Sequence, residues 1–276
     1  MSQLSEAGGA ARDLAPEAAL ALSGVWKSFG GLEVLRGIDL QVAPGEIVTI
    51  LGGSGSGKSV TLKHMIGLLR PDRGRVFVDG EDVTLYSERA WVEVRRRFGY
   101  VFQGAALFDS LSVAENIAFP LREHLKWSER EVRERVRECL AAVALPGIEQ
   151  KMPAELSGGM RKRVGVARAI ALEPSVILYD EPTTGLDPAN ARRIGQLILA
   201  LRKRLRATSV VVTHDLEVCF SVSDRIVLLK DGQLVVEGTP EEIRASSHPD
   251  VREFVGGLEP SEVGDGPSSS EGEIGQ

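Results

Sequence analysis

Short apolar runs, each followed by a polar or glycine-rich turn, recur along the middle of the chain. The clearest are residues 47–51, 176–179 and 210–212, in which almost every position is apolar. Runs that are apolar on both faces are typical of strands in a parallel sheet, because helices cover both faces of such a sheet. The pattern therefore predicts an α/β fold in which buried strands alternate with helices.

Two Asp-Gly pairs add an antiparallel component to this picture. Asp79-Gly80 and Asp231-Gly232 each lie between flanks rich in β-forming residues. Asp-Gly is a preferred pair for two-residue hairpin turns, because such turns need a left-handed backbone that these residues accept. We therefore expect antiparallel hairpins beside the parallel sheet.

Capping boxes predict where two of the helices begin. Thr239 and Glu242 form one box, with proline at the first helical position, and Ser128 and Glu131 form another. Apolar residues at helical spacing follow the second box: Val132, Val136, Leu140 and Val143. That helix belongs to a polar, largely helical segment from about 104 to 160.

The two ends of the chain differ from its middle in composition. Residues 1–20 are rich in Ala, Gly and acids, while residues 257–276 carry several acids, no bases and a run of serines. Such segments bury too little apolar surface to offset the entropy of ordering. We therefore expect a disordered lead-in and a disordered acidic tail around one domain over 21–256. Residues 248–255, with Phe254, have a second interpretation as a segment that docks on a neighbouring subunit.

Charge and cysteine content narrow the function classes. The chain has 33 basic and 39 acidic residues, and a net charge of −6 speaks against a general nucleic-acid binder. The two cysteines, Cys139 and Cys219, are too few and too isolated for a disulfide framework or a zinc site. No apolar stretch approaches the roughly 18 residues that cross a bilayer. We expect a soluble intracellular protein with no nucleic-acid partner.

Residues 52–59, with the sequence GGSGSGKS, match the phosphate-loop pattern G-x-x-x-x-G-K-[ST]. The loop follows the predicted strand 47–51 and precedes a predicted helix over 59–70, which disfavours the alternative of a flexible Gly/Ser linker. Its backbone N–H groups can converge on phosphate oxygens, Lys58 can reach the β- and γ-phosphates, and the Ser59 hydroxyl can coordinate Mg²⁺. The predicted nucleotide-binding residues here are Gly52, Gly53, Ser54, Gly55, Ser56, Gly57, Lys58, Ser59 and Val60.

A second acidic site follows the strand predicted over 176–179. Asp180 can hold Mg²⁺, while Glu181 can orient and deprotonate an attacking water. Either residue alone could belong to a solvated acidic turn, but the pair at the end of a buried strand favours catalysis. Asp180 lies much farther from Lys58 in the chain than one crossover connection requires. The helical segment 104–160 is the candidate insertion between them.

That helical segment ends in Leu-Ser-Gly-Gly-Met, residues 156–160. Here the chain resembles the ABC ATPases, whose signature LSGGQ begins a helix shortly before the second acidic site. The resemblance covers residues from about 22 to 245, with the motifs in family order. It implies a P-loop NTPase core of the ABC ATPase type, with an antiparallel β subdomain and an inserted helical signature subdomain.

The resemblance also implies roles for four single residues. Phe29 is similar to the aromatic residue that stacks on adenine, and Gln103 to the glutamine that senses Mg²⁺ and the attacking water. Asp187 resembles the D-loop aspartate, and His214 the histidine that contacts the γ-phosphate. Taken singly, Phe29 could be a core aromatic and His214 a satisfied loop histidine; their order with the other motifs favours function. The implied catalytic set is Lys58, Gln103, Glu181 and His214, and the implied metal set is Ser59, Gln103 and Asp180.

The family further implies a two-fold dimer, in which the signature of one subunit faces the nucleotide on the other. The signature residues expected against the partner's nucleotide are Ser157, Gly158 and Gly159. Three cations, Arg161, Lys162 and Arg163, follow at a helix N-terminus, where they oppose the helix dipole. We expect a bound polyphosphate to offset that cost.

A narrower resemblance is to the ATPases of MCE-linked, Mla-type phospholipid transporters. Residues 57–68, 102–111 and 156–163 carry it. Met160 departs from the general signature but fits this subfamily, while Gly53 stands where many ABC proteins have proline. The resemblance implies ATP and Mg²⁺ as cofactors, a second copy of the chain, an integral membrane permease and an MCE-domain lipid-binding protein as partners. It also implies a peripheral location on the cytoplasmic face of the inner (plasma) membrane.

Two other functions stay open at this stage. The chain could serve a transporter of amino acids, lipoproteins or organic solvents, which would differ only in its permease. It could also be a non-transport ABC ATPase, although no coiled-coil insertion, nucleic-acid module or second cassette is visible. The stretch 104–116, with Leu107, Phe108 and Leu111, is our candidate for the permease contact. The alternative is that these apolar residues pack only inside the helical insertion.

Overall fold

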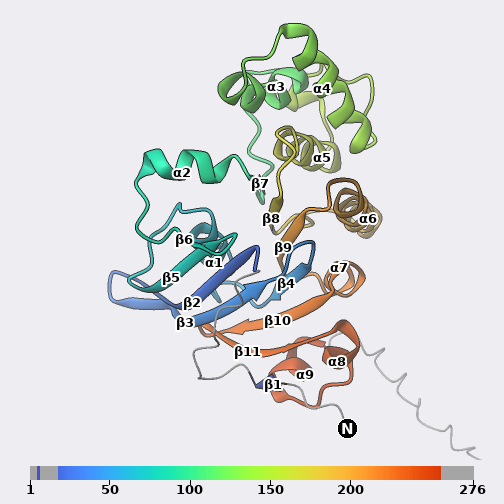
Figure 1. The fold of residues 1–276 in the computed structure, drawn as a ribbon. Coiled ribbons are helices and arrows are strands. Elements are labelled where there is room, and N and C mark those ends of the chain that lie inside the picture. The colour runs from blue at the N-terminus through green and yellow to red at the C-terminus, as the bar shows by residue number, and fades with distance from the viewer. Residues whose placement is uncertain (1–4, 7–17, 256–276) are drawn as a thin grey trace, which may run out of the picture.

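The computed structural model describes residues 5–6 and 18–255 and arranges them around two β-sheets (Figure 1). The larger sheet has seven strands. In spatial order they are β1 (Ser5–Glu6), β11 (Gln233–Gly238), β10 (Arg225–Lys230), β4 (Ile47–Leu51), β9 (Thr208–Thr213), β8 (Val176–Asp180) and β7 (Phe98–Val101). Strands β10, β4, β9, β8 and β7 are mutually parallel. The three apolar runs predicted from the sequence are β4, β9 and β8, at the centre of this sheet.

The second sheet is antiparallel. It contains, in order, β3 (Leu32–Val42), β2 (Leu20–Phe29), β5 (Arg73–Val78) and β6 (Glu81–Asp82). Both predicted hairpins are confirmed: Asp79-Gly80 joins β5 to β6, and Asp231-Gly232 joins β10 to β11. The expected antiparallel component is therefore present beside the parallel sheet.

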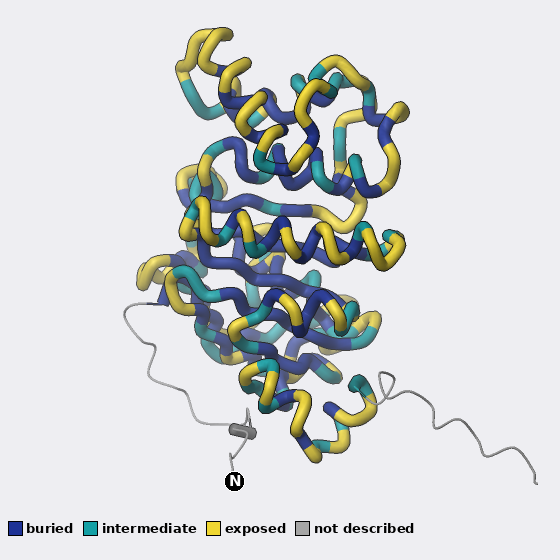
Figure 2. The backbone as a smooth tube through the Cα atoms, turned by 90° about the vertical axis from the view of Figure 1, so that its right-hand side faces the viewer, coloured by how far each residue is buried: buried dark blue, intermediate teal, exposed yellow. Residues whose placement is uncertain are grey.

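The central strands are buried on both faces because two separate apolar clusters cover them. Along β8, Val176 and Leu178 belong to a cluster shared with the antiparallel sheet and helices α1 (Lys58–Met65) and α2 (Glu88–Arg95). Ile177 and Tyr179 point the other way, toward α6 (Pro188–Leu205) and α7 (Leu216–Val222). Figure 2 shows this buried interior between exposed helix faces. The double burial explains why these strands read as continuous apolar runs.

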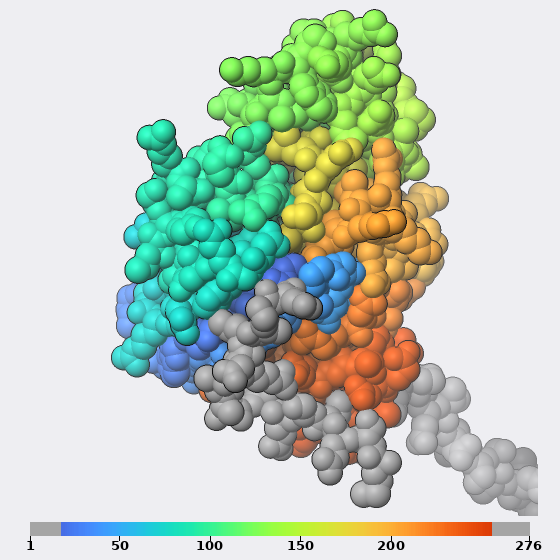
Figure 3. Space-filling view, in the orientation of Figure 1, coloured from blue at the N-terminus to red at the C-terminus, as the bar shows by residue number. Residues whose placement is uncertain are grey.

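The helical segment forms a lobe above the sheets (Figure 3). It contains α3 (Val113–His124), α4 (Glu129–Ala142), a short 3₁₀ turn (Pro153–Glu155) and α5 (Gly158–Ala169). The capping box at Ser128 and Glu131 is confirmed, as is the one at Thr239 and Glu242 that begins α8 (Pro240–Arg244). Helix α5 begins at the signature, as expected, and continues past residue 160, packing against the rest of the same apolar cluster as α6.

Two predicted boundaries differ from the structure. Helix α1 ends at Met65 and not at residue 70, because Gly67 adopts a left-handed backbone (φ 66°) directly against the Trp91 ring. At the N-terminus, Ala18 to Leu20 are already buried, and β1 pairs with β11. The amide of Ala19 donates a hydrogen bond to the carbonyl of Val42. Such a backbone contact cannot be predicted from amino-acid composition. The remainder of the predicted lead-in and the predicted tail 257–276 lie outside the described residues.

Residues 249–255 form helix α9 (Pro249–Val255), which packs on its own chain. Val251 is buried, and Phe254 packs against the same cluster. The Lys230 ammonium pairs with Asp250 (2.6 Å) and with Glu253 (2.9 Å). The apolar face of this segment therefore packs within its own chain, and its docking on a neighbouring subunit stays a prediction. Among the described residues, no helix combines the length and apolar character that crossing a membrane requires.

Asn116 gives a stability prediction for the helical lobe. It is fully buried, accepts a hydrogen bond from the Phe108 amide (2.8 Å) and donates to the carbonyls of Phe108, Leu111 and Ser112. Asn116→Ala leaves these groups without their partner, so we expect the free energy of unfolding to fall by about 2–4 kcal/mol. Urea unfolding measures it. Glu123→Ala, at an exposed position of the same helix, should change it by less than about 0.5 kcal/mol; equal effects of the two changes would contradict the role of Asn116.

Candidate nucleotide site

Most of the predicted site residues lie at the carboxyl ends of the parallel strands. Because β4, β7, β8 and β9 run in the same direction, the residues that follow them meet at one edge of the sheet. Residues 52–59 follow β4, and Gln103 follows β7. Asp180 ends β8 and Glu181 follows it, while His214 follows β9. The topology thus brings together motifs that lie far apart in the sequence.

The phosphate loop places a lysine at the start of α1. Gly57 caps this helix with a left-handed backbone (φ 108°), and a Cβ there would lie 2.7 Å from Leu35 Cδ2. The Lys58 side chain is buried, and its Nζ donates to the carbonyls of Gly52 (2.8 Å) and Gly53 (2.9 Å). The hydroxyl of Ser56 is buried and finds no hydrogen-bond partner in the part of the chain that the structure describes. The loop therefore presents a helix N-terminus, an ammonium and a spare hydroxyl, all suited to an anion.

Both oxygens of the Asp180 carboxylate accept a hydrogen bond. The Ser59 hydroxyl donates to Oδ1 (2.8 Å), and the Tyr100 hydroxyl donates to Oδ2 (2.9 Å). Burial of the phenol and the adjacent Asp180 charge raise the pKa of Tyr100, so its hydroxyl stays protonated. Tyr100 was not among the residues singled out from the sequence.

Glu181 connects the lysine to the histidine. Its carboxylate lies 3.3 Å from the Lys58 ammonium and 2.8 Å from His214 Nδ1, and Thr184 donates to it at 3.2 Å. Both Lys58 and Glu181 are only 7% exposed, whereas His214 lies at the surface of the site. The structure therefore joins Lys58, Glu181 and His214 in one set of contacts and Ser59, Asp180 and Tyr100 in another. Together they form a network only through the chain, because Lys58 adjoins Ser59 and Asp180 adjoins Glu181.

The other predicted site residues lie outside that network. Phe29 is exposed at the end of β2, and the Lys27 ammonium lies over its ring. Ser157 is exposed and caps α5, while Asp187 is exposed and caps α6. Within the described part of the chain, none of these three side chains hydrogen bonds to Lys58, Asp180 or Glu181. Gln103 is exposed, and its backbone carbonyl, not its side chain, is tied to the site.

Lys162 contacts the Gln103 carbonyl, and this contact bears on the prediction made for the three cations at residues 161–163. Its ammonium is buried and donates to the carbonyls of Gln103 and Glu181, the latter at 3.4 Å. Arg163 donates to the carbonyls of Val143 (3.2 Å) and Ala144 (3.1 Å). We expected a bound polyphosphate to offset the charges of Arg161, Lys162 and Arg163. This prediction is wrong for Lys162 and Arg163, because both donate hydrogen bonds to backbone carbonyls of their own chain. Burial lowers the pKa of Lys162, and the charges of Glu181 and Asp180 oppose this shift.

The network has the donor set that a magnesium nucleotide needs. Mg²⁺ takes oxygen ligands and is usually held by one or two carboxylates together with phosphates. Ser59 and Asp180 provide a hydroxyl and a carboxylate oxygen 2.8 Å apart, beside the anion-binding loop. No cluster of three or more His, Cys, Asp or Glu residues suited to a metal occurs in the described ranges.

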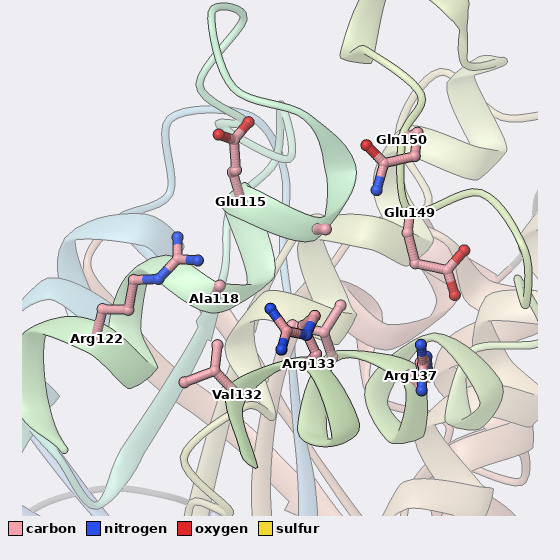
Figure 4. A pocket seen from close by; sticks show the side chains of 10 residues that line it. Glu115, Ala118, Arg122, Val132, Arg133, Arg137, Glu149 and Gln150 are labelled. Carbon is pink, nitrogen blue, oxygen red and sulfur yellow. The ribbon is translucent and has the colours of Figure 1, made fainter. Parts of the chain in front are cut away.

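A groove in the helical lobe is separate from this site. It lies between α3 and α4, has a volume of about 290 Å³, and is shown in Figure 4. Its walls carry three arginines, two glutamates and a glutamine around a floor of small apolar residues. None of the predicted site residues lines it.

Two glycines of the phosphate loop give a paired prediction. Gly57→Ala forces a side chain into a left-handed backbone and against Leu35, so we expect affinity for a fluorescent ATP analogue to fall about tenfold or more. At Gly53 the backbone is not left-handed, and within the described ranges a Cβ would meet the Phe254 ring alone, at 3.7 Å. Gly53→Ala should therefore bind the analogue as the unaltered chain does. Fluorescence titration measures both, and equal losses would contradict the argument from backbone geometry.

Comparison with known proteins agrees with this geometry. The ABC transporter family model matches residues 35–184, more than half of the chain. The chain is 44% identical over 243 residues to the probable ribonucleotide transport ATP-binding protein mkl of Mycobacterium tuberculosis, covering 88% of this chain and 68% of mkl. It is 42% identical over 228 residues to the intermembrane phospholipid transport system ATP-binding protein MlaF of Haemophilus influenzae, covering 83% and 86%.

A solved structure is similar over most of its length. It is the dimeric, post-hydrolysis state of the ATP-binding cassette MJ0796 bound to ADP and Pi, with a TM-score of 0.75 and 35% identity. The match covers 80% of this chain and 98% of that cassette. Fold, motif order and relatives agree with the resemblance inferred from the sequence. This chain belongs to the ABC transporter family, as an ATP-binding subunit that hydrolyses ATP.

Proposed function

We propose that this site hydrolyses ATP with Glu181 as the general base, and that the energy drives phospholipid transport through a separate membrane permease. The observation that carries the catalytic assignment is the position of Glu181 between Lys58 (3.3 Å) and His214 (2.8 Å). Ser59, Asp180 and Gln103 would hold Mg²⁺. The ion would neutralise negative charge on the phosphates.

The buried lysine explains how nucleotide binding prepares the base. In this structure the Lys58 ammonium is shared among the Glu181 carboxylate and the carbonyls of Gly52 and Gly53. Phosphate oxygens in the loop compete for the same ammonium. As Lys58 turns toward them, Glu181 loses its counter-ion and becomes free to accept a proton from water, while His214 holds its other oxygen.

The second element of the proposal is a two-fold dimer with shared sites. Ser157 and Asp187 are exposed and lie outside the hydrogen-bonded network, so both are accessible to a partner subunit. In a two-fold dimer each such surface is used twice, so two complete sites form together. The related cassette MJ0796 is dimeric in its solved structure, which supports the same arrangement here.

The third element is the substrate and its partners. MlaF, 42% identical, is named for intermembrane phospholipid transport, and three stretches of this sequence resemble that subfamily. We infer a permease and an MCE-domain lipid-binding protein as partners at the cytoplasmic face of the inner membrane. A second candidate is ribonucleotide transport, which is the function in the name of mkl, at 44% identity.

An aromatic surface beside Gln103 suits the permease contact. Phe108 and Phe119 are 44% and 46% exposed, and their rings lie 5.1 Å apart. A hollow lined by Leu111, Phe119 and Arg122 adjoins them. Leu107 instead packs against the core, so the alternative reading of the stretch 104–116 holds for that residue. Exposed aromatic pairs of this kind are typical of protein contacts.

The assignment of Glu181 is tested by Glu181→Gln. The amide keeps the size and hydrogen bonding of the side chain but removes the base, so we expect turnover to fall by a factor of about 10²–10⁴. ATP binding should stay within about twofold, because the phosphate loop is unchanged. Since bound ATP is no longer consumed, the dimer should persist in ATP on size-exclusion chromatography.

The matched control is Glu134→Gln, at an exposed position of α4, which removes the same charge far from the phosphate loop. Its turnover should equal that of the unaltered chain. Near-normal hydrolysis by Glu181→Gln would remove Glu181 from the mechanism. A monomer in ATP, for a variant that still binds ATP, would contradict the shared-site dimer.

The transport proposal is tested with the complex of this chain and its permease in liposomes that contain labelled phospholipid. We expect ATP-dependent movement of the label, and Phe108→Asp should reduce that movement about tenfold or more, because it puts a charge into the contact. ATP binding by the isolated subunit should be unchanged. The control Leu85→Asp alters an apolar residue that is 84% exposed and lies between β6 and α2, so it should leave transport intact.

The outcomes separate the parts of this proposal. Movement of a ribonucleotide, an amino acid or a lipoprotein with phospholipid unmoved would overturn the lipid assignment and leave the ATPase in place. Full coupling in Phe108→Asp would show that the permease binds elsewhere. Equal loss in Leu85→Asp and Phe108→Asp would also contradict the proposed contact surface.

A further inference from the structure

Among the described residues, two side chains hydrogen bond to the Asp180 carboxylate, and the mechanism above does not use the bond from Tyr100. Strand β7 pairs in parallel with β8, and the register sets Tyr100 opposite Leu178. Asp180 is two residues further along β8, so its side chain lies on the same face as those of Leu178 and Tyr100. The Tyr100 hydroxyl reaches it and donates to Oδ2 at 2.9 Å.

The geometry points to Tyr100 as a positioning residue that orients the Asp180 carboxylate for the metal–nucleotide complex. This inference rests on the proposed role of Asp180 as a magnesium ligand. The torsion that turns an aspartate carboxylate is soft and has no sharply preferred value. One hydrogen bond on each oxygen therefore selects the orientation: Tyr100 holds Oδ2, and Oδ1 stays directed at Ser59 (2.8 Å).

Support for the Tyr100 ring comes from its own strand and the adjoining cluster. The ring packs against the cluster that contains Val176 and Leu178, and it lies 4.4 Å from the Phe102 ring, centroid to centroid. A phenol fixed in this way gives its hydroxyl one direction. Partners of this kind, which hold a metal ligand without touching the metal, typically change metal affinity by about 10- to 100-fold when they are removed.

A second tyrosine separates positioning from packing. Tyr179 precedes Asp180 on β8, but its side chain points to the opposite face and is fully buried there. Its hydroxyl has no hydrogen-bond partner among the described residues. The two tyrosines thus lie on adjacent strands at the same edge of the sheet, and Tyr100 alone of the two contacts the carboxylate. Tyr179→Phe is the matched control for Tyr100→Phe, since each change removes one hydroxyl oxygen.

The experiment measures metal binding directly in the full-length chain. Mn²⁺ replaces Mg²⁺ as a paramagnetic probe, and its affinity is determined by electron paramagnetic resonance with saturating non-hydrolysable ATP analogue. For Tyr100→Phe we expect Mn²⁺ to bind about tenfold more weakly. Affinity for the analogue in EDTA should be unchanged, and the Mg²⁺ concentration for half-maximal hydrolysis should rise. At saturating Mg²⁺ the turnover number should approach that of the unaltered chain.

Two further variants separate the proposed metal role of Asp180 from the proposed positioning role of Tyr100. Tyr179→Phe should bind Mn²⁺ normally, and Asp180→Asn should lose most Mn²⁺ affinity. If Asp180→Asn binds Mn²⁺ normally, the proposed metal role of Asp180 is wrong. If Asp180→Asn loses Mn²⁺ while Tyr100→Phe keeps it within twofold, Asp180 remains a ligand and Tyr100 is not its positioning residue. A lower melting temperature for Tyr100→Phe with unchanged Mn²⁺ affinity would likewise assign Tyr100 a purely structural role.

Discussion

The buried ion pair between Lys58 and Glu181 is the interaction on which the rest of the site depends. A buried charge is costly unless it is paired and its remaining hydrogen-bonding groups are satisfied. Here carbonyls of Gly52 and Gly53 satisfy the ammonium, and His214 satisfies the carboxylate. These partners come from three neighbouring parallel strands, so the pair can form only when β4, β8 and β9 are in register. The charge balance of the site therefore depends on the order of the sheet.

Helix α5 extends this dependence into the helical lobe. It begins at the exposed signature residue Ser157, and its Lys162 donates to the carbonyls of Gln103 and Glu181. Further along the same helix, Arg168 donates to the carbonyls of Ala105 and Ala106 and lies over the ring of the exposed Phe108. Helix α5 thus connects the signature with the backbone of Gln103 and Glu181 and with the aromatic surface. A displacement of α5 relative to the sheet would disturb the hydrogen bonds of Lys162 and Arg168.

Local features of the sequence predicted most of the fold, because local chemistry determines them. The apolar strands, the Asp-Gly hairpins and the capping boxes are each set by a few consecutive residues. Local features were insufficient where distant contacts decide the structure. Helix α1 stops early because Trp91, far along the chain, packs on Gly67. Residues 249–255 pack on their own chain through Val251 and Phe254, beside the ion pairs of Lys230. Neither partner can be identified from the local pattern.

Part of the candidate site could also be predicted from local sequence and part could not. Tyr100 and Tyr179 illustrate the difference. Alternation along β8 places Val176, Leu178 and Asp180 on one face and Tyr179 on the other, which the sequence alone implies. That Tyr100 lies beside Asp180 follows only from the register of β7 on β8, which places it opposite Leu178. Residue type therefore cannot distinguish a tyrosine that fills the core from one that orients a carboxylate. Side-chain alternation along β8 and the register of β7 on β8 together distinguish Tyr100 from Tyr179. Both are set by the fold, before any ligand binds.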